Sequence, residues 1–335
     1  MYKKIKKYMP LTLIQVKQGF CGVDTYYKSI VDSLNLNNYY YFTKEIKKIE
    51  YHFKDKLIGG IISLALQSYF TKFSKPLHVI DPHVTIKNSE FLTVHDLLPL
   101  KVWNTITRKM FIETIKTAKN ITVLSIITKN ALIDEMNIDE SKITLIPPAI
   151  NSKNFYPDYS FNPYPNDNKL HLITVGDFNP RKRFDKLYQL ISNFDNIELY
   201  HYGRFNNWEY VGKKLLNQYP KIHFIENAPI QKLRNAYSFA DAFIYITDYE
   251  GFGLTAIEAM NTGTKIIVNN LPIFKETMNS YANYLTNNTN ENMEIIQKVL
   301  EKKQSKDALI QYAEKYSLHN FGKNLIKWYA NETIY

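Results

Sequence analysis

The sequence predicts an α/β protein built from two Rossmann-like, doubly wound domains with parallel sheets. Short, almost continuously apolar runs alternate with helical patterns along nearly the whole chain, as expected of parallel strands covered on both faces. The alternation stops once, at residues 151–168. This segment contains three prolines and several Asn and Asp, and its apolar residues show no regular period. A length of 335 residues suits two ordinary domains.

Ten apolar runs are predicted to be strands. Apolar residues at helical spacing lie between them, for example from Val23 to Leu34 and from Leu187 to Ile191. This alternation is typical of βαβ units, which build parallel sheets. The predicted strands are Leu11–Val16, Leu77–Ile80, Phe91–His95, Ile121–Ser125, Ile143–Ile146, His171–Val175, Ile197–His201, Ile222–Ile225, Ala242–Ile246 and Lys265–Val268.

The proline-containing segment is interpreted as a linker, because the strand and helix pattern on each side of it is self-sufficient. The predicted domains are therefore residues 1–150 and residues 151–319. A last amphipathic helix is expected over Asn320–Tyr329.

The composition excludes several classes of protein. Hydrophobic residues make up 45% of the chain and charged residues 22%, which is ordinary globular usage and excludes extensive disorder. The single cysteine, Cys21, excludes an internal disulfide and a multi-cysteine metal site, and it favours a reducing, cytoplasmic setting. The formal charge of +10 favours an anionic partner, but it does not choose among phosphate ligands, an acidic membrane surface and nucleic acid.

The longest apolar run, Leu57–Phe70, is interrupted by polar residues and is shorter than the roughly 20 residues that span a bilayer. We therefore expect a soluble or peripheral protein. Lysines before this run suggest a basic and apolar surface that docks on anionic lipid; a core helix flanked by solvated lysines is the favoured alternative. These lysines are Lys44, Lys47, Lys48, Lys54 and Lys56.

The strongest chemical signal is the stretch Tyr249–Ala259, which follows a predicted strand and opens a helix near Leu254. Its two glycines let the backbone approach a ligand closely, and the free N–H groups of a helix start favour an anion. Glu258, expected in about the first helical turn, can accept hydrogen bonds from two vicinal hydroxyls, as on a ribose. Glu250 precedes the glycines. The alternative is a glycine-rich turn with a Glu that favours the helix dipole.

A second signal, Val175–Arg183, also follows a predicted strand. Three adjacent cations just before a helix are suited to gripping a pyrophosphate. Taken alone, a solvated basic loop explains them better. Their position at the carboxyl end of a parallel strand favours a binding role, because ligands bind there in open α/β sheets.

Two further signals are weak. His95 and Asp96 stand at the end of a strand in the first domain, and such a pair is more often structural than catalytic. The stretch Gly19–Asp24 lies between the first strand and the first helix and lacks the full Gly-x-Gly-x-x-Gly pattern.

Together these stretches resemble the retaining glycosyltransferases of family four, the glycosyl transferases group 1, which have the GT-B fold of two Rossmann-like domains facing a cleft. The resemblance covers nearly the whole chain. Its most specific part is Glu-Gly-Phe-Gly-Leu-x-x-x-Glu at residues 250–258. Other matching stretches are Val175–Gly176 with Pro180–Lys182, Thr128–Tyr156, His95–Asp96 and Gly22.

The resemblance implies a hexosyltransferase that moves a sugar from a GDP- or UDP-linked donor to a glycan, lipid-linked or protein acceptor, with no nucleic acid as partner. It implies that Glu258 binds the donor ribose, and that Lys182 with Arg181 neutralises the pyrophosphate. It places His95 beside the transferred sugar and Gly22 and Gly176 in the glycine turns of the site. Further implied sugar contacts are Glu250, Gly251, Phe252, Gly253 and Leu254. The final helix, within residues 320–335, would pack back on the first domain.

The chain departs from the family pattern at three positions. Asp177 stands where many members have an arginine, which leaves phosphate binding open. Lys265 replaces a usual proline, and Cys21 stands where a second glycine is common.

The expected reaction needs no metal or cofactor, because cations and helix-start N–H groups can stabilise the leaving diphosphate and no Asp-x-Asp motif follows a strand. Two alternatives remain open. One is a non-catalytic nucleotide-sugar-binding protein on the same fold. The other is a nicotinamide-dependent dehydrogenase, which the weak glycine fingerprint disfavours.

Overall fold

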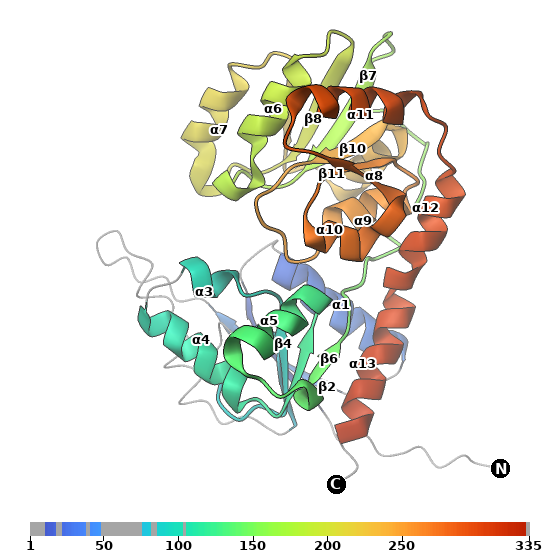
Figure 1. Ribbon diagram of the computed structural model, residues 1–335. Helices are drawn as coiled ribbons and strands as arrows, with labels where there is room; N and C mark the ends of the chain where they lie inside the picture. The colour runs from blue at the N-terminus through green and yellow to red at the C-terminus, as the bar shows by residue number, and fades with distance from the viewer. Residues whose placement is uncertain are drawn as a thin grey trace, which may run out of the picture. The chain divides into compact units, whose positions relative to one another are not determined.

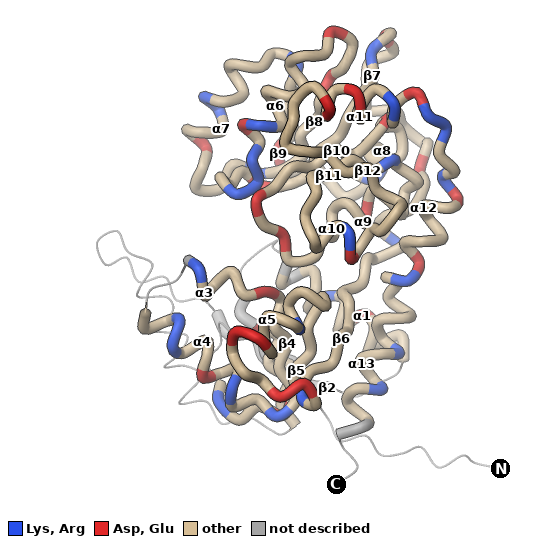
Figure 2. Tube along the Cα trace, viewed as in Figure 1, with Lys and Arg blue, Asp and Glu red and all other residues tan. Residues whose placement is uncertain are grey.

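The computed structural model describes residues 11–17, 22–37, 41–47, 76–81, 86–102 and 105–332. The chain divides into two compact units, Met1–Ala149 with Leu318–Tyr335, and Ile150–Ser317. Each unit has its own parallel sheet, and the α/β class with two such sheets is the class predicted from the sequence. Lys and Arg are spread among Asp and Glu along the described trace of both units, so net charge alone does not locate a site (Figure 2).

The sheet of the first unit has the strand order β2-β1-β3-β4-β5-β6, with every pairing parallel. The chain runs from β1 to one side of it and then to the other, so β1 and β3 flank a switch in direction. The strands are β1 (Leu11–Lys17), β2 (Tyr41–Lys47), β3 (Leu77–Val79), β4 (Phe91–Val94), β5 (Asn120–Val123) and β6 (Ile143–Leu145).

The described helices of this unit are α1 (Gly22–Leu36), α3 (Leu98–Val102), α4 (Thr105–Thr117), α5 (Ile126–Met136) and α13 (Leu318–Glu332). Ser125 caps α5 by accepting a hydrogen bond from the Thr128 N–H, and Asn137 ends it in a left-handed conformation. The core lies between the strands and α4 and α5, where Leu92, Ile121 and Leu132 are fully buried.

The C-terminal helix α13 packs on α1 of the first unit (Figure 1). The Ser33 hydroxyl donates to the Leu318 carbonyl at 3.1 Å, and the Tyr329 hydroxyl lies 2.6 Å from Nδ1 of the buried His78. Gly322 permits this close packing, because a Cβ there would lie 3.0 Å from the Cβ of Ser33. A polar and aromatic interface therefore joins the end of the chain to its beginning.

The sheet of the second unit has the order β12-β11-β10-β7-β8-β9, again entirely parallel. The chain moves outward from β7 to β9 and returns to β10 on the other side of β7. The strands are β7 (Leu170–Val175), β8 (Ile197–Gly203), β9 (Ile222–Glu226), β10 (Ala242–Tyr245), β11 (Ile266–Asn269) and β12 (Ala282–Leu285).

The second unit's strands are connected by helices, and the core packs α6 and α11 against the sheet through Leu187, Ile191 and Ile296, which are fully buried. Residues 151–169 contain no helix or strand, and Phe155 and Tyr164 of this segment are buried in the second unit. The helices are α6 (Phe184–Ser192), α7 (Glu209–Leu216), α8 (Ile230–Phe239), α9 (Leu254–Asn261), α10 (Pro272–Met278), α11 (Thr289–Glu301) and α12 (Lys306–Ala313).

All ten predicted strands are present within about one or two residues, but β2 and β12 were missed. Both lie at an end of their sheet. A strand with one neighbour tolerates polar residues, so neither Tyr41–Lys47 nor Ala282–Leu285 forms the continuous apolar run expected of an inner strand. The segment Leu57–Phe70 lies outside the described residues, as do the lysines near it except Lys44 and Lys47 on β2.

Candidate functional site

The two strongest sequence signals meet in the second unit. β7 and β10 are neighbours, and the chain changes direction between them. The turn after β7 carries Gly176, Arg181 and Lys182, and the turn after β10 carries Glu250. Parallel neighbours end at the same edge of a sheet, and in open α/β folds a switch point at that edge is where ligands bind.

Gly176 lets the Lys182 side chain lie across the end of β7. A Cβ at Gly176 would lie 2.8 Å from the Lys182 Nζ and 3.2 Å from its Cδ. The chain reaches Lys182 through a 3-10 turn, Pro180–Lys182, which begins where the Asn179 side chain accepts a hydrogen bond from the Arg181 N–H. The glycine and the capped turn together bring the ammonium group back over the strand.

The buried side chain of His201 forms a hydrogen bond with the backbone of the same glycine. The carbonyl of Gly176 accepts a hydrogen bond from His201 Nε2 at 2.6 Å, so the His201 Nδ1 is the nitrogen without a proton and accepts from the Tyr188 hydroxyl at 2.5 Å. Burial lowers the pKa of His201 to about 3, the Gly176 hydrogen bond opposes this, and the positive charge of Lys182 adds to it. His201 is therefore neutral, and its tautomer is fixed by its two partners.

The Lys182 ammonium is poised for an anion. It has no hydrogen bond or ion pair within the described part of the chain, although its side chain is largely buried. Burial lowers its pKa, Glu250 and Asp177 oppose the effect, and the neighbouring Arg181 adds to it. A cation that has lost water without gaining a carboxylate partner favours an incoming anion.

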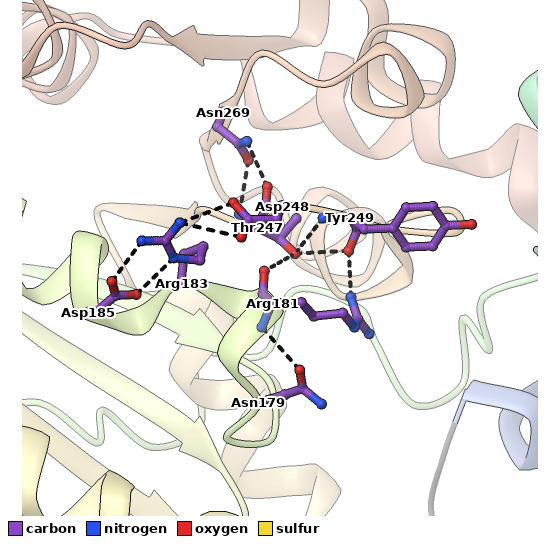
Figure 3. A network of polar contacts seen from close by, with 8 residues as sticks. All are labelled: Asn179, Arg181, Arg183, Asp185, Thr247, Asp248, Tyr249 and Asn269. Carbon is purple, nitrogen blue, oxygen red and sulfur yellow. Dashed lines mark hydrogen bonds and ion pairs between the residues drawn. The ribbon is translucent and has the colours of Figure 1, made fainter. Parts of the chain in front are cut away.

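The two turns are joined by a network of polar contacts (Figure 3). The carbonyl of Arg181 accepts from the Thr247 hydroxyl at 3.0 Å and from the Asp248 N–H at 2.7 Å. Asn269, at the end of β11, exchanges two hydrogen bonds with the Thr247 backbone, at 3.1 and 2.8 Å. The Arg181 guanidinium donates to the Tyr249 carbonyl. These contacts fix the cationic turn relative to β10.

The third cation of the predicted grip, Arg183, is paired with carboxylates. Its guanidinium contacts Asp185 at 2.8 Å and Asp248 at 3.4 Å, and the backbone adopts a left-handed conformation at the start of α6 (Figure 3). The hydrogen bonds and charge of Asp185 raise the pKa of Arg183 further. Arg183 is paired with these two carboxylates, so it is less available to a pyrophosphate than Lys182, which has no such partner among the described residues.

Asp177, which stands where the family pattern has an arginine, is neutralised by another residue. Arg204, just after β8, holds both of its carboxylate oxygens, with Nε at 3.1 Å from Oδ1. The Asn206 amide donates to it at 3.0 Å. Because Asp177 is paired with Arg204, its negative charge repels an anion near Lys182 less strongly.

Glu250 is fixed by two donors. Its Oε2 accepts from the Tyr245 hydroxyl at 3.0 Å and lies 3.5 Å from the Arg181 guanidinium, with 19% of the side chain exposed. The following turn leads to Gly253, whose φ of 92° is in the left-handed region, and a Cβ there would lie 2.9 Å from the Phe274 ring. Glycine is therefore required where the chain enters α9.

No described side chain caps the start of α9, so the N–H groups of Leu254 and Thr255 are uncapped, while the Ala256 N–H donates to the Gly253 carbonyl at 3.1 Å. Gly251, Gly253 and Leu254 lie at this start, and Phe252 is buried with its ring against Tyr316. Phe252 thus supports the turn through packing. Uncapped N–H groups at a helix start favour an anion, and anion binding by this turn stays a prediction.

Glu258 is the fifth residue of α9, so it lies in the second turn and not the first. Burial raises the pKa of this carboxyl to about 8, against its ordinary value of 4.5, and the Tyr237 hydroxyl lowers it. Tyr237 is fully buried on α8, and its hydroxyl has no hydrogen-bond partner of normal geometry among the described residues. A partly buried carboxyl with a raised pKa is suited to a ligand whose hydroxyl groups donate to it.

The remaining predicted residues lie in the first unit. His95 follows β4, and its Nε2 donates to the carbonyl of Ile80, the residue after β3, at 2.8 Å. Its ring meets the buried Tyr26 edge to face, with 4.9 Å between centroids. Gly22 is the first residue of α1, and the rest of its loop, residues 18–21, lies outside the described residues.

A cavity of about 260 Å³ is lined by Asn179 and Pro180 together with residues of the start of α6 and of α7. Neither Arg181 nor Lys182 lines it. Its lining is mostly apolar and includes Phe178, Pro180, Phe184, Trp208 and Leu215.

Sequence reasoning missed the residues that support the site: Tyr245, Thr247, Asn269, His201 and Arg204. Each lies inside or just after an apolar strand, where it is taken for core or turn. Their position at the carboxyl ends of parallel strands was the available signal.

Comparison with known proteins identifies a family whose sequence pattern this chain matches. Residues 157–316 match the family described as glycosyl transferases group 1. The chain carries a group 1 glycosyltransferase domain. The match covers the second unit almost entirely, and this unit holds both Lys182 and Glu258.

Two relatives have mannosyltransferase names. The O-antigen chain mannosyltransferase RfbU of Salmonella typhimurium is 25% identical over 77% of this chain and 75% of its own length. The serotype-specific mannosyltransferase WbdA of Escherichia coli is 30% identical, over 34% of this chain and 15% of its own length.

Solved glycosyltransferase structures share the GT-B fold across nearly the whole chain. A sucrose-phosphate synthase from Thermosynechococcus elongatus superposes with a TM-score of 0.80 at 19% identity, covering 96% of this chain and 98% of that one. Anabaena HepE, solved with UDP and glucose, gives 0.73 at 11% identity, with 95% and 98% covered. The glycosyltransferase WaaG of lipopolysaccharide biosynthesis gives 0.68 at 12%, with 97% and 100% covered. No described helix is both long and apolar enough to cross a membrane.

Proposed function

We propose that this glycosyltransferase moves a hexose, with mannose as the first candidate, from a nucleoside diphosphate to an acceptor hydroxyl, with retention of configuration and without a metal or cofactor. The observation that carries the proposal is Lys182, a largely buried ammonium beside Gly176 that has no anionic partner in direct contact among the described residues. A pyrophosphate supplies the anion that this group lacks.

The proposed roles follow the geometry of the second unit. Lys182 and Arg181 bind the pyrophosphate together with N–H groups at the start of α9. Glu258 binds ribose hydroxyls. Glu250 and the backbone from Gly251 to Leu254 contact the transferred sugar. For His95 and Gly22, contacts to the sugar and on the acceptor side rest on the resemblance alone.

The proposed reaction is a front-face substitution. The bond between the anomeric carbon and the diphosphate oxygen breaks, and its electron pair leaves with the nucleoside diphosphate. The acceptor hydroxyl forms its bond on the same face, and its proton passes to the departing phosphate oxygen. Lys182 and Arg181 stabilise the negative charge that develops on that phosphate, which is where electrostatic catalysis contributes most.

Names of the relatives guide the choice of substrate. Mannosyltransferases of O-antigen synthesis favour GDP-mannose as the first donor to test, and HepE with UDP and glucose places UDP-glucose second. We propose a glycan or lipid-linked acceptor, with a protein acceptor as an outcome of the test. Peripheral contact with an anionic membrane, in the cytoplasm, is part of the same proposal.

The test is a panel of GDP-, UDP- and ADP-sugars in the presence of EDTA, scored for nucleoside diphosphate release by the wild type and Glu258→Ala. We expect release from one donor and its loss in the variant. The anomeric configuration of the product, followed by NMR from the first turnovers, should match that of the donor.

Three outcomes would contradict the proposal. Inversion would exclude the front-face reaction, and an absolute need for a divalent ion would exclude the metal-free route. Nucleotide binding without release from any donor, in the presence of mannosyl acceptors, would favour the non-catalytic binding protein.

A further inference from the structure

Tyr245 links the cation and the carboxylate of the site. It is the last residue of β10, and only 1% of it is exposed. Its hydroxyl donates to Glu250 Oε2 at 3.0 Å. The Lys182 Nζ lies 5.3 Å from the centroid of its ring. One strand residue thus touches two groups that come from different turns.

The hydroxyl of Tyr245 acts only as a donor toward Glu250. Burial raises the pKa of Tyr245 well above its ordinary value, and the negative charge of Glu250 raises it further, so the hydroxyl keeps its proton. Oε2 of Glu250 receives Tyr245 and lies within reach of Arg181. Among the described residues no hydrogen bond is made to Oε1, which leaves this oxygen for the hydroxyls of a ligand.

The ring of Tyr245 stabilises Lys182 in another way. An ammonium within about 6 Å of an aromatic face is attracted by the ring quadrupole. A carboxylate at the same place would neutralise Lys182 and compete with a phosphate. The ring offsets part of the cost of burying the cation and leaves its hydrogen-bond donors unoccupied.

We propose that Tyr245 is a positioning residue of the transfer site, which orients Glu250 toward the sugar through its hydroxyl and holds Lys182 ready for the diphosphate through its ring. The inference rests on the proposed function, and it assigns a role that a core tyrosine would not have. A tyrosine that only fills the core would affect folding but would not act through Glu250.

A double-mutant cycle tests whether the hydroxyl of Tyr245 acts through Glu250. Tyr245→Phe removes one hydrogen bond to a charged group, and we expect kcat/KM for the donor to fall on the order of tenfold. In a Glu250→Ala background the same change should cost nothing further, because the partner is already gone. A tenfold loss that persists in the Glu250→Ala background would overturn the inference.

Tyr164→Phe is the matched control. Tyr164 is also buried in the second unit, and its hydroxyl donates to the Ala236 carbonyl at 2.7 Å. The control removes a buried hydrogen bond of similar length that contacts neither Glu250 nor Lys182. We expect a comparable fall in Tm and an unchanged kcat/KM; an equal loss of kcat/KM in the control would also overturn the inference.

A readout without turnover keeps this inference distinguishable from the proposed function. Acetic anhydride labelling of Lys182 across pH, read by mass spectrometry, gives the apparent pKa of that amine. Tyr245→Leu keeps the apolar burial and removes the ring face, so the pKa of Lys182 should fall by about half a unit, while Tyr245→Phe should leave it unchanged. Equal titration in all three proteins would overturn the role of the ring, whether or not the wild type transfers sugar.

Discussion

Glu258→Gln should remove a pH dependence of nucleotide binding that the wild type shows near neutrality. Burial raises the pKa of Glu258 to about 8, so the carboxyl is mostly protonated in the free protein at pH 7. Ribose hydroxyls donate to the charged form and stabilise it, so binding and ionisation favour each other. The wild type should therefore bind GDP or UDP more tightly as the pH rises toward 8.

The size of the effect follows from that pKa. A carboxyl with a pKa of about 8 is ionised to about 3% at pH 6.5 and to about three quarters at pH 8.5. If only the ionised form binds ribose well, affinity rises on the order of tenfold or more over this range. The glutamine side chain keeps one acceptor oxygen and does not titrate, so its affinity should vary only with the ionisation of the nucleotide, which both proteins share.

Calorimetric titration of GDP and UDP at four pH values between 6.5 and 8.5 measures the difference. The reasoning is refuted if the wild type and Glu258→Gln show the same slope, or if wild-type affinity falls as pH rises. Thermal unfolding gives a second check. A carboxyl with a raised pKa contributes stability that is full below its ordinary value of 4.5 and is lost as pH rises through about 8, so the Tm advantage of Glu258→Gln should grow over this range.

Three other substitutions test the scaffold of the site. Gly253→Ala places a side chain on a residue with a φ of 92°, which costs about 1–2 kcal/mol of folding free energy. Differential scanning calorimetry should therefore show a Tm lower by about 3–6 °C, and an unchanged Tm would contradict the strain. Arg204→Ala frees the Asp177 carboxylate to compete for Lys182, so calorimetry should show GDP affinity several-fold weaker, and unaltered affinity would show that the pair has no such effect. Gly176→Ala places a methyl group 2.8 Å from the Lys182 ammonium, so GDP affinity should fall while Tm changes little; the opposite pattern would mean that the glycine serves folding alone.

Much of the fold could be predicted because the inner strands are continuous apolar runs. Ile121, Leu172 and Ile244 are fully buried, and burial on both faces produces that pattern. The outer strands β2 and β12 were missed because polar residues such as Lys44, Glu45 and Asn283 interrupt their apolar runs, whereas the outer strands β6 and β9 have enough apolar residues to be predicted. The start of α9 was easier to predict than the helical turn that carries Glu258. The start is marked in the sequence by Gly253, whose left-handed backbone precedes the helix.

The residues that we propose to touch a ligand could be selected from the sequence alone. Glycines beside Lys182 and Glu258 stand in recognisable stretches, whereas their partners lie far away in the sequence. Arg204 lies 27 residues from Asp177, and Tyr245 lies in a strand that resembles core. The different partners of Arg183 and Arg181 could not be predicted from the sequence either. Only the fold brings Asp248 to Arg183 and the Tyr249 carbonyl to Arg181.

The most direct test of the site is the affinity of GDP and UDP for the wild type, Lys182→Met and Lys186→Met, measured by calorimetry at one pH. Lys186 is an exposed lysine near the start of α6, so it controls for the loss of a positive charge in the same region. A charged hydrogen bond to phosphate contributes about 1.5–3 kcal/mol, which predicts affinity at least tenfold weaker for Lys182→Met and unchanged for Lys186→Met. Equal affinity in all three proteins would contradict the assignment of Lys182 as the group that binds the diphosphate.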